Sequence, residues 1–292
     1  MADREWAGTT YGNGWMLRHL IVMLRYVDVR ILYLFSAVFV VPVCLVLNRS
    51  RKTAYWYFRR RMGFGRLKAA WSTYINHCLF GQVVIDKFAM YAGKKFEIEL
   101  EGYDNFLGLA AKPEGFVLLS SHIGNYEIAG YTLVAETKVF NALVFAGEKQ
   151  TVMENRDKMF ADTNIRMIPI LPDMSHLFAI DFALQNGEIV SMPADRIHGS
   201  AKSVTAHFLG AEACFPYGAF SVATLRNTPV LAVNVMKRKH NRYKVYVTPL
   251  DYDTEASRKD KIAQVSKAYV AELERMLRMY PTQWYNFFDF WN

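Results

Sequence analysis

Short runs of β-branched and aromatic residues alternate with stretches of helical periodicity from residue 96 onwards. Strands separated by helices are typical of βαβ units, in which parallel strands form a sheet and helices cover its faces. The pattern therefore predicts an α/β fold with a mostly parallel central sheet flanked by helices. The predicted strands are Phe96–Leu100, Phe116–Ser120, Val139–Phe145, Met167–Leu171, Glu188–Met192, Thr205–Leu209, Val230–Met236 and Tyr243–Thr248. Helices are predicted over 125–137, 149–161, 174–186 and 218–227.

The end of the chain contains the clearest helix signal. Ser257 and Asp260 form a start signal of the capping-box type, and Pro281 stops the helix. Between them, one face collects apolar side chains at helical spacing. These are Ile262, Val265, Tyr269, Leu273, Met276, Leu277 and Tyr280.

An uncharged apolar segment, Ile31–Leu47, precedes this pattern. A membrane-spanning helix needs about 20 apolar residues, so the segment reaches that length only with Val29 and with Arg30 and Arg49 extending to the headgroups. Pro42 would kink such a helix. The alternative is a helix buried in the protein core. The residues that follow favour the membrane.

Eight basic residues and no acidic residue lie between Asn48 and Lys68, although the whole chain has a net charge of only +8. They are Arg49, Arg51, Lys52, Arg59, Arg60, Arg61, Arg66 and Lys68. Beside an apolar helix, such a cluster is typical of contact with anionic headgroups on the cytoplasmic side. No recognition motif for nucleic acid accompanies it. We therefore expect residues 1–95 to form a helical membrane-anchor region with a basic flank, and residues 96–292 to form the α/β domain.

One stretch, Phe116–Glu127, carries the strongest catalytic pattern. A buried-type strand runs into His122, a Gly-Asn turn follows, and Glu127 comes five residues after the histidine. In a parallel sheet ligands bind at the carboxyl ends of the strands. If Glu127 folds back to one imidazole nitrogen, the other can take a proton from a hydroxyl. The alternative is a structural histidine with an unrelated glutamate.

The residues from His122 to Glu127 fit the H-x4-D/E motif of lysophospholipid acyltransferases. The longer form, His-x-Gly-Asn-x-Glu, resembles the lipid A late acyltransferases, the lauroyl and myristoyl transferases of Gram-negative bacteria. Further blocks follow in that family's order and extend the resemblance over roughly residues 97–284. They are Glu99–Phe106, Pro193–Gly199, Phe208–Gly210, Phe215–Gly218, Thr228–Val230 and Glu274–Trp284.

The resemblance implies a membrane-associated enzyme that moves a fatty acyl chain from an acyl thioester to a hydroxyl of a lipid acceptor. The donor would be acyl carrier protein or coenzyme A, and no metal or other cofactor is implied. His122 would be the general base, and Glu127 would hold its tautomer. Main-chain N–H groups of Gly124 and Asn125 are candidates for stabilising the oxyanion. The enzyme would act at the cytoplasmic face of the bacterial inner membrane.

Substrate binding is expected at Asn125, Asp195 and Arg196. Arg196 could bind a phosphate or phosphopantetheine group, or it could form a surface salt bridge with Asp195. The block around Asp195 is one residue longer than the commoner spacing, and the aromatic end of the chain resembles acyltransferases of aryl-polyene and aminolipid pathways. An acceptor outside lipid A synthesis therefore stays open. So do a thioesterase or lipid hydrolase that uses the same histidine on water, and a non-catalytic membrane adaptor.

Overall fold

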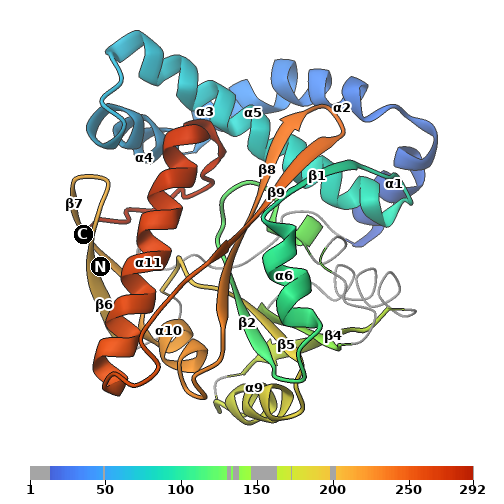
Figure 1. Cartoon of the computed structure of the whole chain (residues 1–292). Helices are drawn as coiled ribbons and strands as arrows, with labels where there is room; N and C mark the ends of the chain where they lie inside the picture. Colours follow the sequence, from blue (N-terminus) through green and yellow to red (C-terminus); the bar gives the residue numbers. More distant parts are fainter. Residues whose placement is uncertain are drawn as a thin grey trace.

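A seven-stranded sheet has the strand order β1-β9-β8-β2-β5-β3-β4 (Figure 1). Every neighbouring pair is parallel except β8 and β9, which form an antiparallel hairpin, so the predicted mostly parallel α/β fold is confirmed. This computed structural model describes residues 14–48, 50–129, 133, 138–145, 163–171, 173–197 and 202–291. The strands are β1 (Glu97–Glu101), β2 (Phe116–Ser120), β3 (Phe140–Phe145), β4 (Ile165–Ile170), β5 (Ile189–Pro193), β8 (Val230–Lys239) and β9 (Arg242–Pro249).

The central strand β2 is buried along its whole length. Val117 and Leu119 pack into a hydrophobic cluster that includes the helix α11 (Arg258–Met279), whereas Phe116 and Leu118 pack into a second cluster with Phe106. Phe106 lies on α6 (Tyr103–Ala110), a short helix that the sequence analysis did not predict. Because both faces of β2 are covered, its sequence can be continuously apolar, whereas a strand with one exposed face alternates apolar and polar residues.

The predicted start and stop of the last helix are confirmed. The Ser257 hydroxyl accepts a hydrogen bond from the Asp260 main-chain N–H at 3.2 Å, and α11 ends before Pro281, which opens a short 3₁₀ turn, η4 (Pro281–Gln283). Of two other predicted helices, α9 (His176–Gln185) lies within the predicted range 174–186, and α10 (Tyr217–Ala223) begins one residue before the predicted range 218–227 and ends earlier. The helix predicted over 149–161 lies outside the described residues. Of 125–137, the structure describes 125–129 and 133, beginning with a 3₁₀ turn, η3 (Tyr126–Ile128).

A separate two-stranded hairpin pairs β6 (Ser203–Phe208) with β7 (Ala211–Pro216). The sequence analysis placed a strand over Thr205–Leu209 but did not predict its partner. Leu209 and Gly210 both have positive φ, +48° and +82°, as a two-residue hairpin turn of type I′ requires. A turn with Leu at its first position lacks the usual Asn-Gly signal, which is why the sequence did not reveal it.

The N-terminal part of the structure is helical, as expected. Along Val29–Leu47 a continuous helical segment of 19 residues is long and apolar enough to cross a membrane, with a mean hydropathy of 2.4 and only 17% of it buried. Tyr33, Ser36 and Val41 are its buried residues, and the segment packs along α5 (Arg66–Tyr91). Because most of the segment is exposed, the alternative of a buried core helix is wrong. The helices are α1 (Gly14–Tyr26), α2 (Val29–Phe35), the π-helical η1 (Ser36–Val40), α3 (Val41–Leu47), α4 (Ser50–Trp56), the π-helical η2 (Tyr57–Arg61) and α5.

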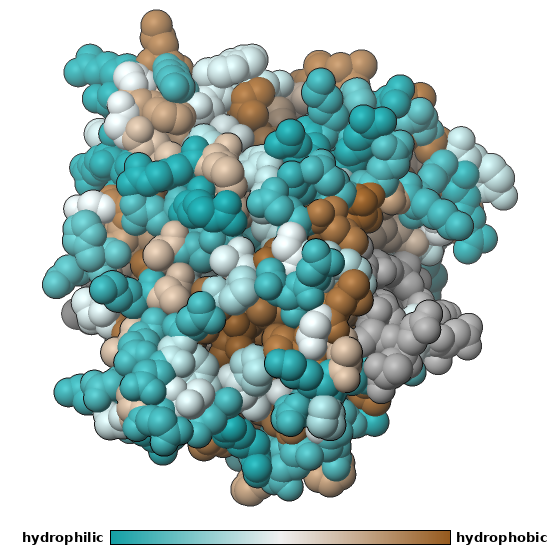
Figure 2. Space-filling view, viewed as in Figure 1, coloured by the Kyte–Doolittle hydropathy of each residue, from teal (hydrophilic) through white to brown (hydrophobic). Residues whose placement is uncertain are grey.

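These helices lie along the upper edge of the molecule, above the carboxyl ends of the parallel strands (Figure 1). On the face drawn in Figure 2, hydrophilic residues dominate, and hydrophobic residues reach the surface at several places along that upper edge. The N-terminal helices therefore cover the edge of the sheet at which a strand-end site would lie.

Candidate active site

Two neighbouring parallel strands carry the central residues of the site. Ser120, the last residue of β2, is in register with Pro193, the last residue of β5. His122 and Asp195 each follow two residues later, so the register of the two strands brings them together. The His122 Nδ1 lies 2.8 Å from Asp195 Oδ1, and the His122 main-chain N–H donates to Asp195 Oδ2 at 2.9 Å. The same carboxylate therefore holds both the ring and the backbone of His122.

Asp195 is buried, whereas the His122 side chain is 17% exposed. Burial by itself raises the pKa of the Asp195 carboxyl, but attraction to His122 and Arg196 and the two hydrogen bonds from His122 outweigh it and lower the pKa below its ordinary value. The ionised carboxylate can only accept, so Nδ1 carries the proton of this bond. Nε2 is then the ring atom that can accept a proton from a substrate.

The structure corrects the expected partner of the imidazole. Glu127 was expected to hold the tautomer, but the carboxylate bonded to Nδ1 is Asp195. Glu127 lies in the η3 turn, where it forms an ion pair with Lys87 at 2.6 Å and accepts a hydrogen bond from the Tyr91 hydroxyl at 3.5 Å. Both partners belong to α5, a helix far away in the sequence, and this is why the motif alone could not assign them.

The two candidate oxyanion donors are already used by main-chain carbonyls. The Gly124 N–H donates to the Gln283 carbonyl and the Asn125 N–H to the Val235 carbonyl, both at 2.8 Å. An oxyanion hole from these two groups is therefore not formed in this structure, and that expectation is corrected. Gly124 has φ +60°, and a Cβ there would lie 1.9 Å from the Val235 oxygen. Only glycine fits so close to β8.

Asn125 was also expected to bind substrate, and this too is corrected. Its side chain is buried, and Nδ2 donates to the Tyr243 hydroxyl at 3.3 Å. The amide is thus engaged by the buried hydroxyl of Tyr243. Because Asn125 follows His122 by only three residues, the loop turns over between them at Gly124.

Arg196 is partly buried, in disagreement with a salt bridge on the surface. Its Nη2 donates to the Tyr285 main-chain carbonyl at 2.8 Å, and its guanidinium lies 5.7 Å from the ring centroid of Phe288. Burial lowers the pKa of Arg196, and the adjacent Asp195 opposes that shift. The residue thus connects the end of β5 to the C-terminal segment, and a phosphate-binding role stays a prediction.

The C-terminal aromatic segment, residues 284–291, lies against the loop that carries His122. Ile123 and Trp284 form an antiparallel bridge, and the Tyr285 N–H donates to the His122 carbonyl at 3.4 Å. On the other side, Asn76 of α5 donates to the carbonyls of Thr282 and Trp284, both at 2.9 Å. The density of aromatic residues in the sequence was the signal that this segment is buried, because such a segment is rarely exposed to solvent.

We expect Phe290→Ala to lower the free energy of unfolding by about 3–5 kcal/mol, as is typical for a large aromatic side chain removed from a core. Phe290 is 7% exposed, and its ring contacts those of Phe208, Phe215, Trp284 and Trp291. Phe178→Ala is the matched control, because Phe178 is 82% exposed and its loss should change stability by less than about 0.5 kcal/mol. Urea titration measures both. Equal values for the two variants would mean that the segment is not part of the core.

Among the residues that the structure describes, no group of three or more His, Cys, Asp or Glu side chains is placed to hold a metal ion. A histidine held by a buried carboxylate at the carboxyl edge of a mostly parallel sheet is an arrangement typical of the class of α/β enzymes that have their site at the strand ends. The sequence model of one family, described as bacterial lipid A biosynthesis acyltransferase, matches residues 80–292. The chain belongs to this family and is an acyltransferase.

Two further comparisons add less. The crystal structure of the 1-acyl-sn-glycerophosphate (LPA) acyltransferase PlsC from Thermotoga maritima is similar over 94% of this chain and 100% of that one. The sequence identity is 14% and the TM-score 0.42, a likeness too distant to support an argument about this chain. No curated protein matches the chain closely enough to count as a relative.

Proposed function

We propose that this acyltransferase moves a fatty acyl chain from an acyl thioester to a hydroxyl of a lipid acceptor, with His122 as the general base. The observation that supports this most is the 2.8 Å contact between His122 Nδ1 and the buried Asp195. Nε2 takes the proton of the acceptor hydroxyl while its oxygen attacks the thioester carbonyl carbon. The carbon–sulfur bond then breaks, and the departing sulfur takes the proton back from the imidazolium. General-base catalysis of this kind contributes about 10²–10⁴-fold in rate.

The other carboxylate of the site has a supporting role in this proposal. Glu127 fixes the η3 turn, and with it the loop that follows His122, to α5 through its ion pair with Lys87. Arg196 is proposed to bind a phosphate of one of the substrates, because a guanidinium presents paired donors to phosphate oxygens. The donor is acyl carrier protein or coenzyme A, and the acceptor is a lipid of the lipid A pathway or of an aryl-polyene or aminolipid pathway.

A purified enzyme assay tests the reaction. The full chain is incubated with acyl carrier protein thioesters or coenzyme A thioesters, with and without lipid A precursors, and the products are separated by mass spectrometry. We expect an acylated lipid to form only when the acceptor is present, with one equivalent of thiol released per ester formed. Thiol release at the same rate without acceptor would instead identify a thioesterase.

We propose further that the apolar segment Val29–Leu47 binds the cytoplasmic face of the bacterial inner membrane. An apolar N-terminal helix and membership of a lipid acyltransferase family both hint at membrane association. Large apolar side chains of the segment are 50–76% exposed, and large exposed apolar patches mark sites of membrane or protein interaction. They are Ile31, Leu34, Phe35, Val38, Phe39, Val43, Val46 and Leu47. The adjacent basic residues from Arg51 to Lys68 would lie at anionic headgroups.

Because the segment Val29–Leu47 packs against α5, its insertion into one leaflet of the membrane is favoured over a helix that crosses the bilayer. The Tyr74 hydroxyl of α5 donates to the Ala37 carbonyl at 3.1 Å, and Tyr33 donates to Asp86 of α5. A helix crossing the bilayer would break these contacts along the segment. The hydrophobic side of the segment can enter the lipid while its other side stays on α5.

We expect the full chain to stay on anionic vesicles at high salt, because salt screens the headgroup attraction but not apolar burial. The double substitution Phe35→Ser/Phe39→Ser should weaken vesicle binding at high salt by at least about tenfold, since burying each Phe contributes about 1.5–3 kcal/mol. The matched control is Phe178→Ser/Phe182→Ser on α9, a pair with the same helical spacing and exposures of 82% and 61%. Vesicle sedimentation measures the bound fraction. Release of the wild type by salt alone would contradict the apolar anchor.

A further inference from the structure

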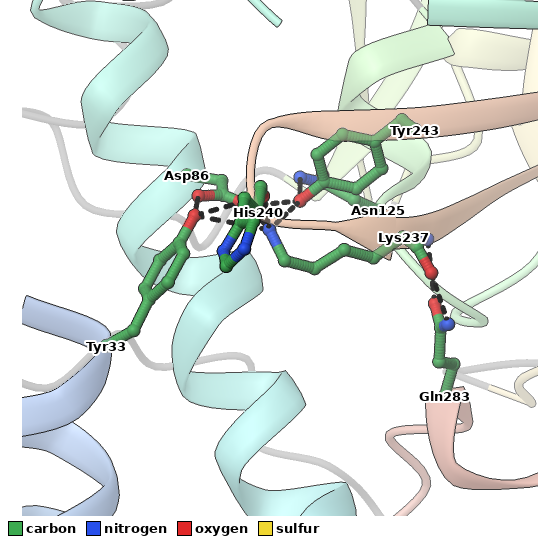
Figure 3. A network of polar contacts seen from close by, with 7 residues as sticks. All are labelled: Tyr33, Asp86, Asn125, Lys237, His240, Tyr243 and Gln283. Carbon is green, nitrogen blue, oxygen red and sulfur yellow. Dashed lines mark hydrogen bonds and ion pairs between the residues drawn. The ribbon is translucent and has the colours of Figure 1, made fainter. Parts of the chain in front are cut away.

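A second buried charged pair has no part in the chemistry proposed above. Asp86 of α5 and Lys237 of β8 form an ion pair, with side-chain exposures of 0% and 2% (Figure 3). The Tyr243 and Tyr33 hydroxyls both donate to Asp86, and the Lys237 ammonium also donates to the His240 carbonyl at 2.6 Å. Every charge in this cluster is therefore matched by hydrogen bonds.

Such a pair is a poor source of stability, because taking both charges out of water costs about as much as their attraction returns. Burial raises the pKa of Asp86 and lowers the pKa of Lys237, while the attraction between them opposes both shifts. What a fully satisfied buried network does provide is one fixed arrangement of the elements that it joins. The role of the Asp86–Lys237 network therefore depends on which elements it joins.

The network reaches the loop of His122 by two routes. The Tyr243 hydroxyl, which donates to Asp86, accepts from Asn125 Nδ2 at 3.3 Å. The second route uses the Lys237 backbone, whose N–H donates to Gln283 Oε1 at 2.8 Å and whose carbonyl accepts from Gln283 Nε2 at 2.7 Å. The Gln283 carbonyl in turn accepts from the Gly124 N–H at 2.8 Å. Gly124 and Asn125, the two residues of the turn after His122, are thus both tied to the charged pair.

The network also reaches the apolar N-terminal segment. Tyr33 is the buried residue of α2, and its hydroxyl bonds Asp86 and lies 3.2 Å from the Lys237 ammonium. Figure 3 shows the Tyr33 side chain extending from α2 across to the cluster, with Asn125 and Gln283 on the opposite side of it. One cluster therefore joins the segment with the exposed apolar face to the loop that carries His122.

We propose that Asp86 and Lys237 are positioning residues for His122, and that Tyr33 makes the alignment of His122 depend on the seating of Val29–Leu47 against α5. This inference rests on the proposed function of His122 and adds a link between the membrane-facing segment and the site. When the segment is seated, the Tyr33 hydroxyl completes the network, and Asn125 and Gly124 hold the loop. When the segment is displaced, Asp86 loses one of its donors and the loop loosens.

Three conservative variants test the link: Tyr243→Phe, Tyr33→Phe and the control Tyr252→Phe. Each removes one bonded hydroxyl and keeps the ring, but Tyr252 donates to the Thr228 carbonyl at 2.8 Å, outside the network. We expect kcat to fall about 5–30-fold in the first two, the factor that 1–2 kcal/mol of misalignment represents. KM should change less than about twofold. A purely structural role would lower the melting temperature and leave kcat unchanged.

Hydrogen exchange of the peptide covering residues 121–129 gives a readout that needs no acyl transfer. We expect faster exchange there in Tyr243→Phe and Tyr33→Phe than in the wild type or in Tyr252→Phe. Unchanged exchange in Tyr243→Phe overturns the positioning role, and unchanged exchange in Tyr33→Phe overturns the link to the apolar segment. If the wild type makes no acylated product, the proposed function fails, and the exchange measurement still decides whether the network fixes the loop.

Discussion

Replacing His122 with alanine is expected to lower acyl transfer by about 10²–10⁴-fold, the contribution of a general base. The side chain is 17% exposed and its ring contacts Tyr126 at a centroid distance of 5.3 Å, so its removal leaves no large cavity in the core. The variant should therefore fold normally. The initial rate of lipid acylation measures the effect.

A matched control for this variant is His207→Ala, because His207 is an exposed residue of the β6–β7 hairpin. Its rate should stay within about twofold of the wild type, since surface substitutions away from a site change little. Turnover by His122→Ala at the wild-type rate would mean that His122 is not the base, and the chemistry would have to be sought elsewhere in the chain.

The second large effect is expected for Asp195→Asn, with a loss of about 10²-fold or more in kcat. An amide has nearly the same shape, but it carries no charge and can present an N–H to Nδ1. The ring would then favour the tautomer with its proton on Nε2, which cannot accept the proton of a hydroxyl. An orienting aspartate in a catalytic triad has a comparable influence.

Comparison with Glu127→Gln assigns the roles of the two carboxylates. Because Asp195 and not Glu127 is bonded to Nδ1, we expect Glu127→Gln to lose less activity than Asp195→Asn. Both rates are measured at saturating substrate, so that kcat is compared. A greater loss in Glu127→Gln would return the orienting role to the carboxylate of the H-x4-E motif.

The sequence singled out His122 by its position, and the structure places it where that reasoning predicted, two residues beyond the end of β2. A continuous apolar strand can only be a central strand covered on both faces, and a polar residue just beyond it lies at the edge where ligands bind. Asp195 was also singled out, but as a substrate residue. Its contact with His122 depends on β5 lying next to β2 with Ser120 opposite Pro193, and strand order is a tertiary property.

Local signals predicted the elements that depend on nearby residues. The helix α11 begins directly after the capping Ser257 and ends two residues before Pro281, and most strands of the main sheet fall where β-branched and aromatic residues gather. The hairpin of β6 and β7 and the short helix α6 were missed. The β6–β7 turn at Leu209-Gly210 and the start of α6 at Gly102 both have positive φ, and neither is marked by a strong turn sequence.

By itself the sequence determined the class of fold, the apolar segment with its basic flank, and the histidine, because periodicity, charge and strand ends are local properties. Only the tertiary structure decided which groups serve that histidine. It gave Nδ1 to Asp195, turned Asn125 inward, occupied the N–H groups of Gly124 and Asn125, and joined Tyr33 to the loop through Asp86 and Lys237. Each of these contacts joins residues far apart in the chain, and strand order and helix packing, which no local pattern encodes, bring them together.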